Sequence, residues 1–249
     1  MRSWRSSRSG WDTPNRRGDA KIMGLADNIS RRLRRVRMRR FHSIYSRFRD
    51  FTMVPEEVFV TNLEIAAQVA PVPGAIVECG TWRGGMIAGI ASLLGSGREY
   101  HLFDSFEGLP QAGEQDGAAA RSWQAQAQTA SHHFNCRAAE TDAAEAMRRA
   151  GVERPHIVKG WFSDTLPRAD FPGGIALLRM DADWYDSTLQ VLEALFNQVN
   201  EGGVVLVDDY YLWDGCSRAI HDYLSRTQAR ERINAQRGVC FINKLARQA

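Results

Sequence analysis

The sequence predicts an α/β protein built on a doubly wound, mostly parallel, seven-stranded β-sheet. From residue 55 onward, short apolar runs alternate with longer helix-like runs, and several of the apolar runs border Gly, Pro or Asp. Buried parallel strands have near-continuous Val, Ile and Leu, because helices cover both faces of such a sheet. Ligands of these sheets bind beyond the carboxyl ends of the strands, so the residues that follow each strand are the first candidates for a site.

The elements follow in order along the chain. Pro55 and the two glutamates after it begin a helix over residues 55–70, since proline and acidic residues are favoured in a first turn. Small residues after a glycine make 84–94 a second helix, and later helices are expected over residues 141–150, 187–200 and 217–228. The apolar runs that we expect as strands cover residues 75–79, 99–103, 156–159, 175–180, 204–207 and 238–244.

Composition excludes several protein classes. The 249 residues are 44% hydrophobic and 24% charged, close to globular averages, which excludes a wholly disordered or fibrous chain. No run approaches the roughly 18 apolar residues of a membrane span. The four cysteines lie far apart with no CxxC pair, which argues against a zinc knuckle or a disulfide framework and favours a reducing compartment, so we expect a cytoplasmic protein.

The charge is unevenly distributed. Residues 1–50 carry 15 Lys and Arg against 4 Asp and Glu, whereas residues 51–249 carry 17 against 25. We expect residues 1–50 to be a basic extension, disordered over 1–21 and helical over 29–51, and residues 51–249 to be the folded domain. Contact with nucleic acid or an acidic membrane is one interpretation, but a solvated basic helix is favoured because charge runs are usually solvated.

A glycine-rich loop follows the first predicted strand. Glu78, Gly80 and Gly84 form the pattern E-x-G-x-x-x-G, which ends a strand and opens a helix with free N–H groups. The pattern is not GxGxxG, which weakens a dinucleotide interpretation and fits S-adenosylmethionine (SAM) enzymes. Asp104 ends the next strand, where a carboxylate can accept ribose hydroxyls. The alternative is a tight turn with a solvated aspartate.

Aromatic residues follow the third predicted strand. Trp161 and Phe162 could lie against an adenine ring, and Ser163 and Asp164 offer polar edges. Packing in the core or at an interface is the stronger interpretation of the two aromatic side chains.

Four carboxylates follow the fourth and fifth predicted strands. Asp181, Asp183, Asp208 and Asp209 would repel one another unless a cation lies between them, and all-oxygen ligands select Mg²⁺, Ca²⁺ or Mn²⁺. Such an ion could bind the paired hydroxyls of an acceptor, and Asp183 is the candidate general base. The alternative is that these aspartates cap helices or turns.

A long insertion follows the second predicted strand, at about residues 111–140, and is a natural lid over an acceptor. Trp123, His132, His133 and Phe134 could stack on a sugar or bond to it. For the two histidines, a solvated loop pair is slightly favoured.

Five motifs together resemble one known family. VECGTWRGG, LFDSFEGLP, KGWFSDTLP, LRMDADWYDST and VVLVDDYY, in this order and spacing, are similar to the macrocin O-methyltransferase family over roughly residues 51–246. The resemblance implies a Rossmann-like class I SAM methyltransferase that requires SAM and Mg²⁺ and methylates sugar hydroxyls of antibiotics. It also implies a homodimer or higher homo-oligomer, although the family's longer helical N-terminal portion is replaced here by the Arg-rich extension.

The resemblance also assigns roles to residues. Asp181, Asp208 and Asp209 would hold the metal, and Asp183 would be the catalytic base. The expected cofactor-binding residues are Thr52, Met53, Glu78, Gly80, Thr81, Trp82, Arg83, Gly84, Asp104, Ser105, Phe106, Glu107, Gly108, Ser163, Asp164 and Asp181.

The sequence therefore predicts a SAM- and Mg²⁺-dependent O-methyltransferase acting on a small molecule, in particular on a sugar of a glycosylated natural product, with no nucleic-acid partner and no membrane span. The alternatives are a catechol-type phenol methyltransferase, a nucleic-acid-binding or RNA-modifying protein that uses the basic extension, and a non-catalytic adenosyl-ligand binder.

Overall fold

The computed structural model describes residue 32, residues 35–129 and residues 132–246. The chain divides into two units, Met1–Arg40 and Phe41–Ala249. In the first unit the described residues are helical, whereas the predicted disordered stretch 1–21 lies outside the described residues. The second unit begins ten residues before the boundary expected from the sequence.

One sheet of seven strands organises the second unit, as the sequence predicts. The order of its strands is β3-β2-β1-β4-β5-β7-β6, and every pair is parallel except β5 with β7 and β7 with β6. The strands are β1 (Ala75–Cys79), β2 (Tyr100–Asp104), β3 (His156–Lys159), β4 (Ile175–Met180), β5 (Val199–Val207), β6 (Ile233–Gln236) and β7 (Val239–Asn243). The strand order reverses between β1 and β4, which places a ligand crevice at their carboxyl ends.

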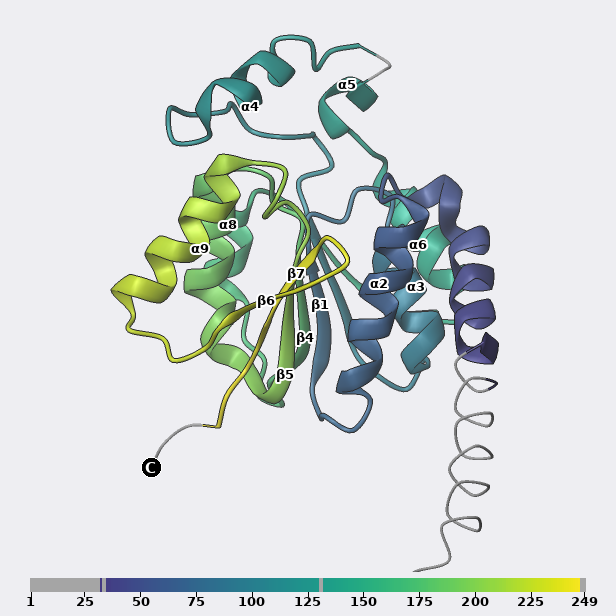
Figure 1. Cartoon of the computed structure of the whole chain (residues 1–249). Helices are drawn as coiled ribbons and strands as arrows, with labels where there is room; N and C mark the ends of the chain where they lie inside the picture. The colour runs from purple at the N-terminus through teal and green to yellow at the C-terminus, as the bar shows by residue number, and fades with distance from the viewer. Residues whose placement is uncertain (1–31, 33–34, 130–131, 247–249) are drawn as a thin grey trace, which may run out of the picture. The chain divides into compact units, whose positions relative to one another are not determined.

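Helices cover both faces of this sheet. Figure 1 shows α8 and α9 on one face and α2, α3 and α6 on the other, with α4 and α5 beyond one end of the strands. The α-helices are α2 (Glu56–Ala66), α3 (Gly85–Leu94), α4 (Gly117–Gln124), α5 (His133–Cys136), α6 (Glu140–Arg149), α7 (Phe162–Thr165), α8 (Tyr185–Leu195) and α9 (Asp214–Arg226). Short 3-10 turns are η1 (Arg49–Phe51), η2 (Ala67–Val69), η4 (Leu166–Arg168) and η5 (Phe196–Gln198).

The central strands form the core. Every residue of β1 and β4 is buried, as expected for parallel strands that are covered on both faces. Glu78 and Arg179 are the two charged residues within these otherwise apolar strands. Their burial requires partners, because an unpaired charge in an apolar interior is costly.

The helical residues 41–48 contribute to the same unit. Phe41, Ile44 and Phe48 are buried, and the ring of Tyr45 meets that of Phe59 in α2 edge-on, with centroids 5.4 Å apart. This apolar face explains why the unit begins before residue 51. No helix in the described part of the chain has the length and apolar character needed to cross a membrane.

Candidate functional site

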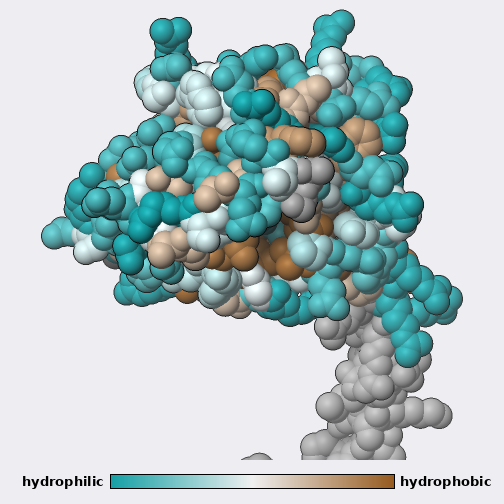
Figure 2. All heavy atoms as spheres, turned by 90° about the horizontal axis from the view of Figure 1, so that it is seen from above, coloured by the Kyte–Doolittle hydropathy of each residue, from teal (hydrophilic) through white to brown (hydrophobic). Residues whose placement is uncertain are grey.

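A cavity of about 540 Å³ lies at the carboxyl ends of β1, β2, β4 and β5. The strand-following loops and the 111–140 segment both line it. Seen from above the molecule, hydrophobic residues show between hydrophilic ones (Figure 2). The exposed hydrophobic residues on its wall are Met53, Trp161 and Leu212. A concave, partly apolar site with a few charged groups is typical of a small-molecule pocket.

The cavity brings together most of the predicted cofactor residues. Those that line it are Thr52, Met53, Glu78, Gly80, Thr81, Trp82, Asp104, Ser105, Gly108, Ser163 and Asp181. Those that do not are Arg83, Gly84, Phe106, Glu107 and Asp164. Arg83 instead pairs with Asp142 of α6 at 3.4 Å, and Phe106 is buried.

The loop between β1 and α3 depends on glycine where the chain passes close to β4. Gly80 has φ +83°, and a Cβ on it would lie 1.7 Å from the carbonyl oxygen of Asp181. Only glycine fits such a contact at a left-handed φ. The backbone of the glycine-rich loop at Gly80 is therefore in direct contact with the backbone of Asp181, a predicted metal ligand.

Asp104 connects the loop after β1 to the loop after β2 by hydrogen bonds. One carboxylate oxygen accepts N–H bonds from Thr81 and Trp82, each at 2.7 Å, and the other accepts the N–H of Phe106 at 2.6 Å. Burial raises the pKa of this carboxyl, while the three N–H groups oppose that shift. Asp104 thus has a structural role that the sequence did not suggest. Its oxygens keep further lone pairs for a ligand such as a ribose.

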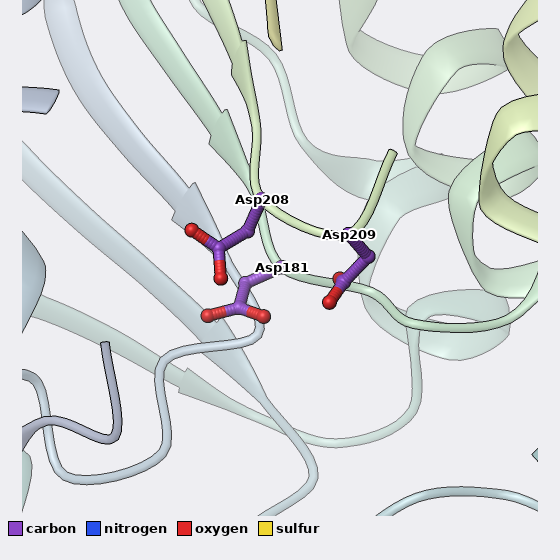
Figure 3. A group of neighbouring side chains, drawn as sticks. All are labelled: Asp181, Asp208 and Asp209. Atoms are coloured by element: carbon purple, nitrogen blue, oxygen red, sulfur yellow. The ribbon is translucent and has the colours of Figure 1, made fainter. Parts of the chain in front are cut away.

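Three carboxylates meet beside the ends of β4 and β5 (Figure 3). Asp181, Asp208 and Asp209 each offer an oxygen within 4.8 Å of the others. The pairing of β4 with β5 explains this arrangement, because Met180 lies opposite Val207. Asp181 directly follows Met180, and Asp208 and Asp209 directly follow Val207. The predicted cluster of Asp181, Asp208 and Asp209 is thus present as geometry.

Asp183 reaches the cluster from the loop after β4 and not from the strand itself. Strand β4 ends at Met180, and Asp183 has a left-handed φ of +53°, a rare conformation for a non-glycine residue. Its backbone N–H donates to Oδ2 of Asp209 at 3.0 Å, and its Oδ1 accepts a bond from Nε1 of Trp213 at 3.0 Å. These bonds hold Asp183 next to the three carboxylates.

The cluster is electrostatically unfavourable without a cation. Burial and then the charge of Asp208 raise the pKa of Asp181 to about 6. Burial and then the charge of Asp181 raise the pKa of Asp183 to about 8, and the pKa of Asp209 rises for the same kinds of reason. The site therefore favours binding of a cation, whether protons or a metal ion.

Arg179 is a residue of the site that the sequence analysis did not single out. It lies on β4, is 1% exposed, lines the cavity, and forms ion pairs with Glu78, Asp181 and Asp208. A signal was present, because an arginine inside the apolar run 175–180 needs a buried partner.

Three tryptophans join the 111–140 segment to the loops that follow β4 and β5. The rings of Trp123, Trp184 and Trp213 meet edge-on, with centroid distances between 5.2 and 6.3 Å. Nε1 of Trp184 donates to the carbonyl of Pro110 at 3.0 Å. Of the residues proposed to contact a sugar, Trp123 lines the cavity, whereas His132, His133 and Phe134 do not.

Asp116 fixes the same segment to the start of α8. It is 4% exposed, and its carboxylate accepts the N–H of Tyr185 at 2.6 Å and that of Gly113 at 2.7 Å. Trp184, the N-cap residue of α8, makes no side-chain capping bond, so Asp116 satisfies a free N–H of the helix from a distant part of the chain. Sequence reasoning missed this contact because Asp116 and Tyr185 are 69 residues apart.

Comparisons with known proteins identify the family of the chain. A model of the family described as Macrocin-O-methyltransferase (TylF) matches residues 45–242. The 8-demethyl-8-(2,3-dimethoxy-alpha-L-rhamnosyl)-tetracenomycin-C 4'-O-methyltransferase of Streptomyces olivaceus is 36% identical over 162 residues, covering 62% of this chain and 59% of that protein. The demethyldecarbamoylnovobiocin O-methyltransferase of Streptomyces niveus is 36% identical over 163 residues, covering 62% of this chain and 60% of that protein.

A solved structure is also similar. The O-methyltransferase NovP superposes with a TM-score of 0.66 at 29% identity, covering 79% of this chain and 83% of that one. The sequence matches span about three-fifths of the length of the curated relatives.

Proposed function

Because the chain belongs to the macrocin O-methyltransferase family, we propose that it transfers a methyl group from SAM to a hydroxyl of a small molecule, namely a sugar carried by a glycosylated natural product. One observation carries the proposal: the glycine-rich loop, the carboxylate cluster and the three tryptophans Trp123, Trp184 and Trp213 all line a single cavity. The names of the two relatives support the substrate class, because one names a rhamnosylated tetracenomycin and the other names demethyldecarbamoylnovobiocin.

The residues present suit SAM. Oε2 of Glu78 is buried at the cavity and accepts no hydrogen bond within the described part of the chain. A buried, unpaired carboxylate oxygen is costly, and a cationic group such as the amino group of SAM would compensate it. Gly80 lines the cavity and lets the glycine-rich loop pass close to Asp181, which brings this loop and the carboxylates to one site.

The donor set also suits a hard divalent cation. Asp181, Asp208 and Asp209 supply only oxygen, which favours Mg²⁺ over zinc. Each carboxylate accepts a hydrogen bond through one oxygen, and the other oxygen accepts none within residues 35–129 and 132–246. One oxygen of each therefore stays available to an ion. We assign Mg²⁺ to this position, where it would bind the acceptor's hydroxyls and lower the pKa of one of them.

The chain's own residues perform the other steps. Oδ1 of Asp183 is occupied by Trp213, so Oδ2 is the atom that takes the proton of the acceptor hydroxyl. A base whose pKa lies near the working pH is the most effective, and burial, followed by the charge of Asp181, raises the pKa of Asp183 toward that range. The tryptophans that line the cavity exclude water and offer flat faces to an acceptor.

An acceptor panel with radiolabelled SAM tests the proposal. It contains demethyldecarbamoylnovobiocin and the rhamnosylated tetracenomycin named above as sugars, catechols as flat diols, and RNA. Methylation of a sugar that is lost in Asp183→Asn is the expected result. Methylation confined to catechols or to RNA would replace the proposed substrate class, and activity that survives Asp183→Asn would remove the assigned base.

The panel is run with Mg²⁺ and with EDTA, because metal dependence is a separate part of the proposal. Full activity in EDTA would contradict the assigned ion. A homodimer and a cytoplasmic location stay predictions, and sedimentation of the purified chain checks the first of them.

A further inference from the structure

One arginine links three carboxylates from three adjacent strands. Nη1 of Arg179 donates to Oε1 of Glu78 at 3.0 Å and to Oδ2 of Asp181 at 2.9 Å, and Nη2 donates to Oδ1 of Asp208 at 2.6 Å. Glu78 lies in β1, Asp181 directly follows β4 and Asp208 directly follows β5. Two of these three partners are ligands of the proposed metal site.

The register of the sheet makes this arrangement necessary. Arg179 lies opposite Glu78 in the β1–β4 ladder and opposite Leu206 in the β4–β5 ladder. Asp181 and Asp208 come two residues after Arg179 and Leu206, and side chains two residues apart emerge on the same side of a strand. The positions of these residues in β1, β4 and β5 therefore place the guanidinium next to the three carboxylates.

The guanidinium occupies one oxygen of each of the two ligands. Oδ2 of Asp181 and Oδ1 of Asp208 are bonded to Arg179, so each carboxylate is fixed in rotation and presents its other oxygen. Groups that bond to metal ligands in this manner orient them, and their loss typically lowers metal affinity about 10–100-fold. Glu78 in turn anchors the guanidinium from the neighbouring strand β1.

We propose that Arg179 is a positioning residue of the metal site, which orients Asp181 and Asp208 for a divalent ion. This inference rests on the metal part of the proposed function. The competing account is that Arg179 only neutralises buried carboxylates. A metal ion should then compete with the guanidinium for these carboxylates, and loss of Arg179 should strengthen metal binding.

Arg179→Lys separates the two accounts. Lysine keeps the positive charge, but its single ammonium cannot reproduce a planar fork that bonds three carboxylates from fixed directions. The matched control is Arg226→Lys, since Arg226 pairs with Glu193 at 2.6 Å on the exposed surface of α8 and α9.

The test is Mn²⁺ titration of the full chain, with free Mn²⁺ followed by electron paramagnetic resonance and no acceptor present. Affinity at least about fivefold weaker in Arg179→Lys, with Arg226→Lys equal to the natural chain, is the expected result. A smaller loss, or tighter binding, would overturn the inference. Circular dichroism checks that each variant is folded, and S-adenosylhomocysteine binding is a second check for the two arginine variants.

If Arg179→Lys does not fold, Glu78→Ala decides in the same titration, because it removes the oxygen that anchors Arg179 and leaves both metal ligands unchanged. A loss of at least about twofold supports the positioning role, and a smaller change contradicts it. Failure of the natural chain to bind Mn²⁺ would instead refute the metal part of the proposed function. Mn²⁺ binding by the natural chain therefore distinguishes failure of the positioning role from failure of the metal assignment.

Discussion

The indole Nε1 of Trp213 donates a hydrogen bond to Oδ1 of Asp183 at 3.0 Å, across the two loops that follow β5 and β4. Asp183 is held in a left-handed conformation, which costs of order 1–3 kcal/mol and persists only where neighbours enforce it. The indole bond and the bond from the Asp183 N–H to Asp209 supply that enforcement. Trp213 therefore fixes the orientation of the proposed base.

Trp213→Phe should lower the rate of methyl transfer about tenfold to a hundredfold, because the base keeps its chemistry but loses its orientation. Trp184→Phe is the matched control, since its Nε1 bonds to Pro110 within the same ring cluster rather than to Asp183. In an Asp183→Asn background, Trp213→Phe should have little further effect. Equal rate losses from Trp213→Phe in the two backgrounds would show that Trp213 acts only through packing.

Asp208→Asn should abolish methyl transfer while SAM affinity stays within about tenfold, because the ion serves mainly the acceptor. Asparagine keeps the size of the side chain and an oxygen that can accept from Arg179. Isothermal titration of SAM, alongside the transfer assay, measures both quantities. Parallel losses of SAM binding and activity would show that the cluster is structural.

The sheet was predictable because its strands are apolar runs with clear ends. Residues 75–79, 156–159 and 175–180 were expected as strands and are β1, β3 and β4. The edge strand β6, with the sequence INAQ, was missed because it is only half-buried and pairs on one side with β7. An edge strand needs few apolar residues, so its sequence carries a weak signal.

The site was predictable where it depends on strand ends and not where it depends on long-range contacts. The meeting of Asp181 with Asp208 and Asp209 follows from neighbouring parallel strands. The arginine in the run 175–180 indicated a buried partner, but the sequence does not identify Glu78, 101 residues away, as that partner. It also does not identify Tyr185, 69 residues away, as the partner of Asp116. The helix α4 was also missed, because it lies in a polar, alanine-rich insertion and Ala120 is its one buried residue.

Asp116→Ala should loosen the 111–140 segment and lower the free energy of unfolding by about 1–2 kcal/mol, as loss of a helix cap does. The carboxylate caps α8 at Tyr185 and also bonds to Gly113, so both contacts are lost. Hydrogen exchange should become faster over α4 and at the first turn of α8. Asp186→Ala, an exposed residue in that same turn, is the control and should leave exchange over α4 unchanged.

Glu78 makes the stability of the metal-free protein depend on pH. Burial is the main reason that its pKa rises from 4.5 to about 8 in the folded chain. Between these values the folded state keeps a proton that the unfolded state releases, so stability falls as pH rises toward 8. In EDTA, the natural chain should therefore melt at a higher temperature at pH 6 than at pH 8.5, by at least about 2–4 °C.

Glu78→Gln removes this titration while it keeps the size of the side chain and an oxygen that can accept from Arg179. Its melting temperature should change less between pH 6 and pH 8.5 than that of the natural chain, although Asp181 and Asp183, whose pKa values are also raised, still contribute in the same direction. Differential scanning fluorimetry in EDTA measures both slopes. An identical slope in the two proteins would show that Glu78 is ionised throughout this range and that Arg179 compensates its burial fully.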